Sequence, residues 1–514
     1  MSKLLKNNKV LNKFRNKFVL TENDALQYES TGDNCLDLFS HIGSFRTQSR
    51  QRILKDFYNA YQENPIVAAK ILFWARAARK GGGERAVFHT IMEEIIQDSP
   101  KFIEDNAKLI AELGYWRDLY EYFDNRKVQD VIAEAIHNKD RLACKWAPRK
   151  GPHARKLRDL LNITNKKYRQ WLKEHSETVE QQMSNEQWDN IKYESVPGQA
   201  MRKYKKAYGN HDGDRFQEWK LDDTKASVSA SYPHDVIKLI CNPEWMESFL
   251  DDADFDLAEK QWRNLPDHIK EGENILPMID VSGSMSGLPM LIAVSLGLYL
   301  SEHNKGSFKD TFLTFSGSPE LIRFDSGAPL KDKLHRIIKA DWGMNTDFQK
   351  AYRTILDTAV SFNVPQSAMP TMLLVLSDMQ FDQSQGSYWN DDKADLDYTE
   401  KLHFESIKKE FKKAGYEAPK LVFWNLSASD CKGSPAQVSD DGVAMVSGFN
   451  PVLMKAILNC EDFNPMKIMF EALKDIDVDV TNLPDELETL KLSLDREEVN
   501  GYNTISPTAH TYLS

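Results

Sequence analysis

The chain of 514 residues is much longer than one ordinary domain, and at ~150 residues per domain it predicts about three domains. Hydrophobic residues make up 41% and charged residues 28%, a mixture typical of a globular protein and not of a disordered or fibrous one. The 77 acidic residues outnumber the 66 basic residues, which gives a formal net charge of −11. A chain with this net charge is not a polycationic protein that binds nucleic acid nonspecifically over its whole surface. Any nucleic-acid site must therefore be a local basic surface.

Several features indicate a reducing, cytoplasmic environment and no membrane segment. No apolar run reaches roughly 18 residues, the minimum for a transmembrane helix. The first eighteen residues carry six basic and no acidic side chains but no apolar signal core, so residues 1–34 are expected to be a basic arm. An organelle transit segment remains an alternative. The cysteines are few and widely spaced, which favours neither disulfides nor a thiolate zinc site: Cys35, Cys144, Cys241, Cys431 and Cys460.

Residues 35–272 are expected to form an α-helical, HEAT-like repeat domain. Apolar residues recur at helical spacing, and proline and glycine separate the segments, as Pro65 and the GGGE at 81–84 illustrate. Pairs of short helices favour a helical stack, although no fixed period is found. Residues 211–272 are polar and mixed, and we expect an irregular link there. In chain order, the first four predicted helices cover residues 48–62, 65–79, 85–97 and 100–112.

The segment 141–210 is basic, with 16 Lys and Arg against 7 Asp and Glu. Basic side chains contact phosphates and aromatic rings stack on bases, so this composition predicts an RNA-binding face. The alternative is a solvated face whose aromatic residues are core, which the helical spacing of Trp171 and Trp188 favours. The interleaved aromatics are Trp146, Tyr168, Trp171, Trp188, Tyr193, Tyr204 and Tyr208. The candidate RNA-binding residues, with those around the triple glycine, are Arg76, Arg79, Lys80, Arg85, Lys145, Arg149, Lys150, Arg155, Lys156, Arg158, Lys166, Lys167, Arg169, Arg202, Lys203, Lys205 and Lys206.

Residues 273–472 alternate strands with helices, which predicts an open, doubly wound and mostly parallel sheet. The run 371–378 is continuously apolar, as in a central strand covered on both faces. The acidic tail 473–514 is expected to add an end helix or to be partly mobile. The predicted strands are 275–280, 311–316, 371–378, 420–427 and 442–448, and the predicted helices are 289–303, 330–340, 347–360, 395–415 and 451–458.

One motif at the strand ends predicts a metal-binding site. The strand 275–280 ends in Asp280-Val281-Ser282-Gly283-Ser284, so three oxygen side chains at alternate positions can converge. In a parallel sheet, ligands bind at the carboxyl ends of the strands, where Thr346 and Asp378 are also expected. Oxygen donors with few charges suit Mg²⁺. The alternative is a set of loops in which these residues only cap helices.

The order DxSxS, then Thr, then Asp resembles the metal-ion-dependent adhesion site of von Willebrand factor A domains. All five positions match: Asp280, Ser282, Ser284, Thr346 and Asp378. The resemblance implies that the serines and the threonine ligate a divalent cation such as Mg²⁺, while the aspartates act largely through water. It also implies that an acidic group of a partner protein completes the coordination shell.

A wider resemblance covers roughly residues 35–460. WARAARKGGGERAVFH, GYWRDLYEY, KWAPR, VPGQAMRKYKKAY, DWGMNTDFQKAY and VSGFNPVLMK are similar to a family named only as a domain of unknown function. Its members join a helical N-terminal half to a C-terminal von Willebrand A domain of Rossmann-like type. The layout more distantly resembles the Ro autoantigen (TROVE) family, whose ring of helical repeats binds small noncoding RNA. The GGGER and GYWRDL segments carry that likeness best.

Three hypotheses follow. The first is a non-enzymatic protein of ribonucleoprotein type, in which the helical half engages structured noncoding RNA and the A domain captures an acidic partner through Mg²⁺. The second is a protein-protein adaptor, associated with an ATPase or a larger assembly, without RNA binding. The third is a metal-dependent phosphodiesterase, for which Asp378 and Asp382 could be a carboxylate pair, but no general base or nucleophile accompanies them. GGGER is not a phosphate loop, because no strand precedes it and no GK[ST] follows.

Overall fold

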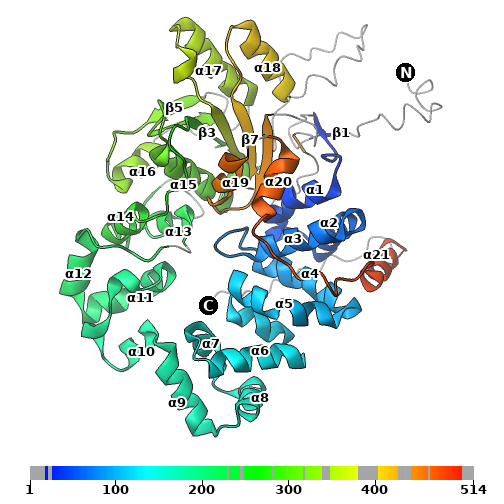
Figure 1. Ribbon diagram of the computed structural model, residues 1–514. Helices are drawn as coiled ribbons and strands as arrows, with labels where there is room; N and C mark the ends of the chain where they lie inside the picture. The colour runs from blue at the N-terminus through cyan, green and yellow to red at the C-terminus, as the bar shows by residue number, and fades with distance from the viewer. Residues whose placement is uncertain are drawn as a thin grey trace.

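The computed structural model describes residues 18–20, 26–228, 231–242, 248–280, 283–315, 319–338, 348–379, 403–426, 434–435, 442–460 and 463–499. The first half is mostly helical and the second half contains a six-stranded sheet (Figure 1). A short antiparallel pair, β1 (Phe18–Leu20) and β2 (Leu26–Tyr28), precedes the helices. None of the described helices is long and apolar enough to span a membrane.

The N-terminal helices follow the predicted amphipathic segments closely. Local caps fix their starts: Ser49 accepts a hydrogen bond from the Arg52 amide, and Asn64 caps a helix with Pro65 at its first turn. The helix predicted over 65–79 ends at Arg76, because the triple-glycine segment folds back and the Gly82 amide donates to the Trp74 carbonyl. These elements are α1 (Asn34–His41), η2 (Ile42–Thr47), α2 (Arg50–Glu63), α3 (Pro65–Arg76), α4 (Arg85–Asp98), α5 (Pro100–Leu113) and η3 (Trp116–Tyr122).

Short helices continue through the basic segment and beyond it. The expectation of an irregular link over 211–272 is wrong, because three helices form there. Their polar sequences are anchored by a few buried large side chains, among them Phe216, Trp219 and Trp262. The elements are α6 (Arg126–His137), α7 (Arg141–Trp146), α8 (Gly151–Leu161), α9 (Asn165–Ser176), α10 (Val179–Ser184), η4 (Trp188–Asn190), η5 (Tyr193–Ser195), α11 (Gly198–His211), α12 (Gly213–Leu221), α13 (Pro233–Ile237) and α14 (Phe255–Arg263).

The sheet has the order β5-β4-β3-β6-β7-β8. All pairings are parallel except β4 with β5, an edge strand that the sequence pattern did not predict. The chain therefore builds outward from β3 on one side and restarts beside β3 with β6, which makes β3 and β6 the topological switch point. The strands are β3 (Ile275–Asp280), β4 (Thr311–Phe315), β5 (Glu320–Arg323), β6 (Met372–Ser377), β7 (Lys420–Asn425) and β8 (Val443–Ser447).

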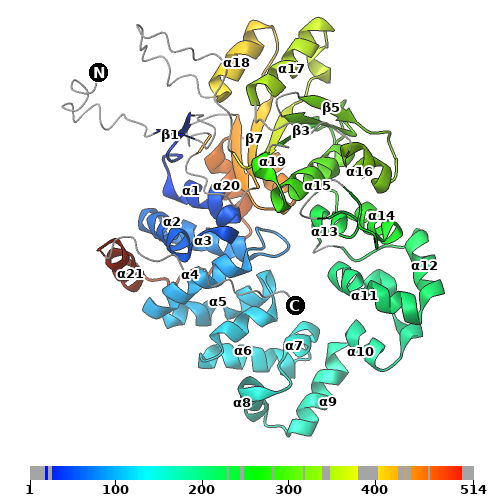
Figure 2. The same cartoon turned by 180° about the vertical axis from the view of Figure 1, so that it is seen from behind.

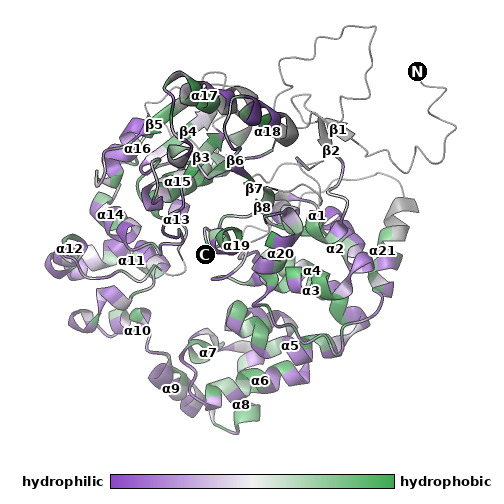
Figure 3. Ribbon diagram, turned by 45° about the horizontal axis from the view of Figure 1, so that its top comes forward, coloured by the Kyte–Doolittle hydropathy of each residue, from purple (hydrophilic) through white to green (hydrophobic). Residues whose placement is uncertain are grey.

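Helices flank this sheet, as the alternating pattern predicts. The helix α15 is apolar nearly all round because it packs between β3 and the helix α13 of the N-terminal half. Figure 3 shows α15 as mainly hydrophobic and α9 and α12 as mainly hydrophilic. The remaining elements are η6 (Gly283–Met285), α15 (Leu288–His303), α16 (Leu330–Ile338), α17 (Phe348–Ser361), η7 (Gln366–Ala368), α18 (His403–Lys413), α19 (Leu453–Asn459), α20 (Pro465–Leu473) and α21 (Glu488–Val499). Residues 395–402 of one predicted helix lie outside the described residues.

The helical half begins and ends against the sheet half. At its start, α1 packs on β8 and α3 on α20; at its end, α13 packs on α15 and α14 on α16. Figures 1 and 2 show the intervening helices α6 to α10 farthest from the sheet. At the first contact the Gly43 amide donates to Ser447 Oγ at 2.9 Å, and Asn450 Nδ2 donates to the Gly81 carbonyl at 2.8 Å. The two halves therefore meet in two places, one at the start of the helical half and one at its end.

The acidic tail returns to the helical half. Asn106 holds the backbone of Asp479 through both of its amide atoms, at 2.8 and 2.9 Å. Ser99 Oγ donates to the Asn482 carbonyl at 2.7 Å, and α21 packs against α2 and α4. The predicted end helix thus forms, and residues 479–489 connect the sheet half to α4 and α5.

Candidate functional site

Two aspartates lie at the neighbouring carboxyl ends of β3 and β6. Asp280 ends β3 and Asp378 follows β6, and both side chains are fully buried, with 0% exposure. The register pairs Ile279 with Leu376, and the Ser377 hydroxyl donates to Asp280 Oδ2 at 2.6 Å. Met379, with φ of 64°, turns the chain directly after Asp378. A positive φ is rare in residues other than glycine, and the residues that have one are often found at active or ligand-binding sites.

Of the five residues of the predicted metal site, three belong to the described part of the chain. Asp280 and Asp378 lie at neighbouring strand ends, and Ser284 lies exposed in η6. Ser282 and Thr346 lie outside the described residues, and so does Asp382. No group of three or more His, Cys, Asp or Glu side chains gathers within that part. The predicted site differs from such a group because it relies on hydroxyl oxygens and only two carboxylates.

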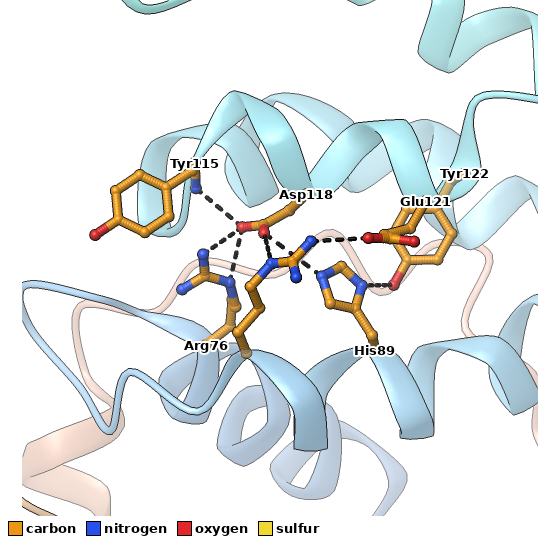
Figure 4. Close-up of polar contacts among 7 residues, drawn as sticks. Arg76, His89, Tyr115, Asp118, Glu121 and Tyr122 are labelled. Carbon is orange, nitrogen blue, oxygen red and sulfur yellow. Dashed lines mark hydrogen bonds and ion pairs between the residues drawn. The ribbon is translucent and has the colours of Figure 1, made fainter. Parts of the chain in front are cut away.

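Around the triple glycine, two predicted RNA-binding residues instead belong to an ion-pair network (Figure 4). Arg76 is only 1% exposed, and its Nε donates to Asp118 Oδ2 at 2.8 Å. Arg85 Nε donates to Asp118 Oδ1 at 2.7 Å, and Arg85 Nη2 to Glu121 at 2.8 Å. Arg76 is therefore withdrawn from solvent and Arg85 is neutralised, whereas Arg79 and Lys80 are exposed. The reason is that η3 places Asp118 directly over the end of α3.

Burial raises the pKa of Asp118, but its partners outweigh burial and lower that pKa well below its usual range. The lowering comes from the contact with His89, the charge of Arg76 and the hydrogen bonds from Arg85 and the Tyr115 amide. The His89 Nε2 contact measures 3.5 Å, so we regard the closer guanidinium groups as the stronger partners. His89 Nδ1 meets the Tyr122 hydroxyl at 2.6 Å, which completes a buried polar cluster.

The basic residues of α11 are also partly neutralised. Arg202 lies 3.7 Å from Asp235 and donates to Gln261 Oε1 at 3.0 Å. Burial lowers the pKa of Arg202, with Asp235 opposing this. Lys206 pairs with Asp252 at 3.4 Å and Lys205 donates to the Asp252 carbonyl, while Lys203 is exposed beside the Tyr204 ring. These cations hold α11 to α13 and to the segment before α14.

The basic residues between the start of α7 and the end of α9 differ in their partners from those of α3, α4 and α11. Within the described part of the chain, none of them forms an ion pair with a carboxylate; Arg149 and Arg158 donate only to backbone carbonyls. All are exposed or half-exposed. We call this set the α7–α9 basic surface: Lys145, Arg149, Lys150, Arg155, Lys156, Arg158, Lys166, Lys167 and Arg169.

The aromatic residues of the basic segment divide into core and surface. Tyr168, Tyr193 and Tyr208 are at most 2% exposed and belong to the core. Trp171 and Trp188 pack partly buried against that core, in agreement with their helical spacing. Trp146 is 36% exposed, and its ring centroid lies 6.4 Å from that of Tyr115, which is 41% exposed. Sequence analysis missed Tyr115 because it lies outside the basic segment.

The comparisons with known proteins identify relatives without a named function. The profile described as "Domain of unknown function (DUF2828)" matches residues 21–124 and 121–275, and "Domain of unknown function (DUF7788)" matches residues 274–494. An uncharacterized protein of Acanthamoeba polyphaga mimivirus, L728, is 27% identical, with 88% of this chain and 87% of that protein covered. The expected resemblance to a family of unknown function is thus found in part: two separate profiles meet where β3 begins, and neither description names a von Willebrand factor A domain.

Among solved structures, the Ro (RSR) protein of Deinococcus radiodurans is 14% identical over 86% of this chain and 94% of that chain. The TM-score of 0.36 is too low for this likeness to indicate function. Functional conclusions therefore depend on the residues themselves. Two features remain: the buried Asp280 and Asp378 at the switch point, and a basic surface whose cations form no ion pair within the described residues.

Proposed function

We propose that this chain binds RNA through the α7–α9 basic surface. The supporting observation is the contrast in partners: cations of α3, α4 and α11 are paired with Asp118, Asp235 and Asp252, whereas the nine cations of this surface lack carboxylate partners in the described structure. Unpaired exposed cations repel one another, so such a surface is stabilised by a polyanion. When lysine and arginine side chains neutralise RNA phosphates, the counterions condensed on the RNA are released, and this release drives the association of protein with RNA.

The aromatic pair Tyr115 and Trp146 favours nucleic acid over other polyanions. Both rings are partly exposed, and Lys145 Nζ lies 5.7 Å from the centre of the Trp146 ring. A base can stack on such a ring while neighbouring cations contact the backbone phosphates. A polyanion without bases gains nothing from these rings. We therefore expect single-stranded regions of an RNA to lie at this end of the surface.

Charge reversal tests the proposal. We expect the variant Arg155→Glu, Lys156→Glu, Lys166→Glu and Lys167→Glu to bind RNA at least about tenfold more weakly, because four phosphate contacts become repulsive. The slope of log affinity against log salt should also fall, by ~0.7 for each lost contact with single-stranded RNA. Both quantities are measured by fluorescence anisotropy titration with a structured noncoding RNA at several salt concentrations. Any RNA found to copurify with the wild-type protein would serve as a natural ligand in the same titration.

The matched control reverses four exposed helical lysines elsewhere: Lys101, Lys127, Lys412 and Lys413. Its net charge change is the same, so it separates a local contact from the effect of overall charge. Equal loss of affinity in the two variants would contradict a defined RNA surface. Absence of RNA binding by the wild-type protein at low salt would instead favour the protein-protein adaptor.

A second function is favoured by the carboxylates at the switch point. We propose that Asp280 and Asp378, together with Ser282, Ser284 and Thr346, bind Mg²⁺ in the manner of an adhesion site of a von Willebrand factor A domain. The two aspartates at these neighbouring strand ends are each 0% exposed, so their charges are costly to bury, and a divalent cation would compensate that cost. The oxygen-only donor set fits a hard cation. A Mg²⁺ ion held by these residues would supply a Lewis-acid contact for a carboxylate of a partner protein. We propose no catalysis at this site.

Calorimetric titration tests this site. The double variant Ser282→Ala and Ser284→Ala should bind Mg²⁺ or Mn²⁺ at least about tenfold more weakly, because two of the proposed ligands are lost. Affinity for RNA should stay within about twofold of the wild-type value, since the basic surface is on the other half. The control Asp332→Asn removes an exposed carboxylate of α16 and should change neither quantity. Undiminished metal binding by the double variant would contradict the assignment of these ligands.

A further inference from the structure

A hollow lies at one end of the α7–α9 basic surface, between α7, α9 and α10. Its volume is about 540 Å³, and four cations line it: Lys145, Arg149, Arg169 and Lys173. The single carboxylate of its wall is Glu180. The other lining side chains are hydroxyls and amides, which can donate hydrogen bonds. The lining therefore has a formal excess of three positive charges.

None of the four cations forms an ion pair with an acidic group in the part of the chain that the structure describes. Within the described residues, Arg149 uses only Nη1, which donates to the carbonyls of Lys145 and Ala147 at 3.3 and 3.5 Å. Its Nε and Nη2 donors carry no hydrogen bond to the described residues. Lys173 Nζ donates to Asn185 Oδ1 at 3.5 Å, and Arg169 is exposed. Several strong donors thus face one concave site, and none of them has a carboxylate acceptor among the described residues.

Glu180 does not neutralise the hollow. One of its carboxylate oxygens accepts from the Tyr204 hydroxyl at 3.4 Å, and the other is enclosed without a hydrogen-bond partner in the described structure. No ion pair links Glu180 to the four cations in that part of the chain. Its charge therefore weakens the attraction of an anion without occupying the cationic donors.

We propose that this hollow binds a terminal phosphate of the RNA, an inference that rests on the proposed RNA-binding function. A terminal phosphomonoester carries about −1.5 to −2 charges at neutral pH and presents three acceptor oxygens. A phosphodiester inside the chain carries one charge and continues in both directions, which suits the open surface of α8 better than a hollow. Guanidinium groups match phosphate oxygens in pairs, so Arg149 and Arg169 are the expected direct contacts. The adjacent Trp146 can stack on the end nucleotide.

The test compares three forms of one short single-stranded RNA: with a 5′-phosphate, with a 3′-phosphate, and with hydroxyl groups at both ends. We expect one phosphorylated form to bind the full-length protein at least about tenfold more tightly than the unphosphorylated form. In the variant Arg169→Gln and Lys173→Gln this preference should disappear. Both residues are exposed on α9, so the fold should be retained, as a melting curve will verify.

Two further variants make the test specific. Lys166→Gln with Lys167→Gln changes cations of the same helix that do not line the hollow, and should weaken all three RNAs by the same factor. Glu180→Gln should raise the preference for the phosphorylated end about twofold or more, because a repulsive charge is removed. A loss of preference in Glu180→Gln would contradict the assigned electrostatics.

The outcomes distinguish the two proposals. Equal affinity of the wild-type protein for all three RNAs overturns the terminal-phosphate site and leaves RNA binding in place. If none of the RNAs binds, both proposals are wrong. Competition with inorganic phosphate and a nucleoside 5′-monophosphate separates the sources of the phosphate group. If the monophosphate binds in the hollow while the RNA ends make no difference, the ligand is a small phosphorylated molecule, and the inference is overturned.

Discussion

Replacing Asp118 by alanine is expected to lower the free energy of unfolding by about 3–5 kcal/mol, the usual cost of removing one member of a buried ion pair. Asp118 is completely buried and receives hydrogen bonds from Arg76, Arg85 and the Tyr115 amide. Alanine leaves the Arg76 guanidinium, which is 1% exposed, without its counter-charge. The penalty is therefore that of an uncompensated buried cation and not only that of lost hydrogen bonds.

Urea unfolding followed by circular dichroism measures this effect. The control Asp130→Ala removes an exposed carboxylate that pairs with Arg126 at 3.1 Å, and should cost less than about 1 kcal/mol. Because the folded-state pKa of Asp118 is depressed, its contribution is present above about pH 4 and is lost as the pH falls toward that folded value. The wild-type protein should show this acid-dependent loss and Asp118→Ala should lack it. A change below 1 kcal/mol in Asp118→Ala would show that Arg76 finds another partner or water.

Sequence periodicity predicted the helices whose boundaries are fixed locally. The helix expected over 48–62 forms as Arg50–Glu63, because Ser49 caps its start and five apolar residues face the core. The short helices α12 and α14 were missed because their buried residues, such as Trp219 and Trp262, gain stability only from contacts with distant elements. The edge strand β5 was missed for a similar reason: its pairing with β4 is tertiary and Leu321 is 52% exposed.

The candidate sites also differ in whether local sequence or tertiary contacts determine them. The adjacency of Asp280 and Asp378 could be predicted, since carboxyl ends of neighbouring parallel strands meet at one edge. The RNA-binding residues could be predicted only as a composition, because a sequence count does not say which cation meets which carboxylate. Arg76 meets Asp118, which lies 42 positions away, and Lys206 meets Asp252. Lys173 could have been included among the candidate RNA-binding residues, because Lys173 follows Arg169 by four positions and so lies on the same helix face.

Replacing Gly43 by alanine is expected to lower the free energy of unfolding by about 3 kcal/mol, the upper end of the range for overpacked sites. A Cβ at this position would lie 2.3 Å from the backbone nitrogen of Gly448 and 2.6 Å from the carbonyl carbon of Ser447. Both are backbone atoms at the end of β8, so no side-chain rotation relieves the overlap. The Gly43 amide would also lose its 2.9 Å bond to Ser447 Oγ.

The control for this change is Gly209→Ala, because a Cβ there meets nothing within 4 Å and the residue lies inside α11. Alanine in a helix interior should stabilise the protein by up to about 1 kcal/mol, so the two substitutions have opposite signs. Urea unfolding and limited proteolysis then report on the contact between the halves. If the halves unfold together in the wild-type protein, Gly43→Ala should expose new cleavage sites at η2 and the end of β8. Wild-type stability of Gly43→Ala would mean that the α13–α15 contact and the tail 479–489 hold the halves together without this junction.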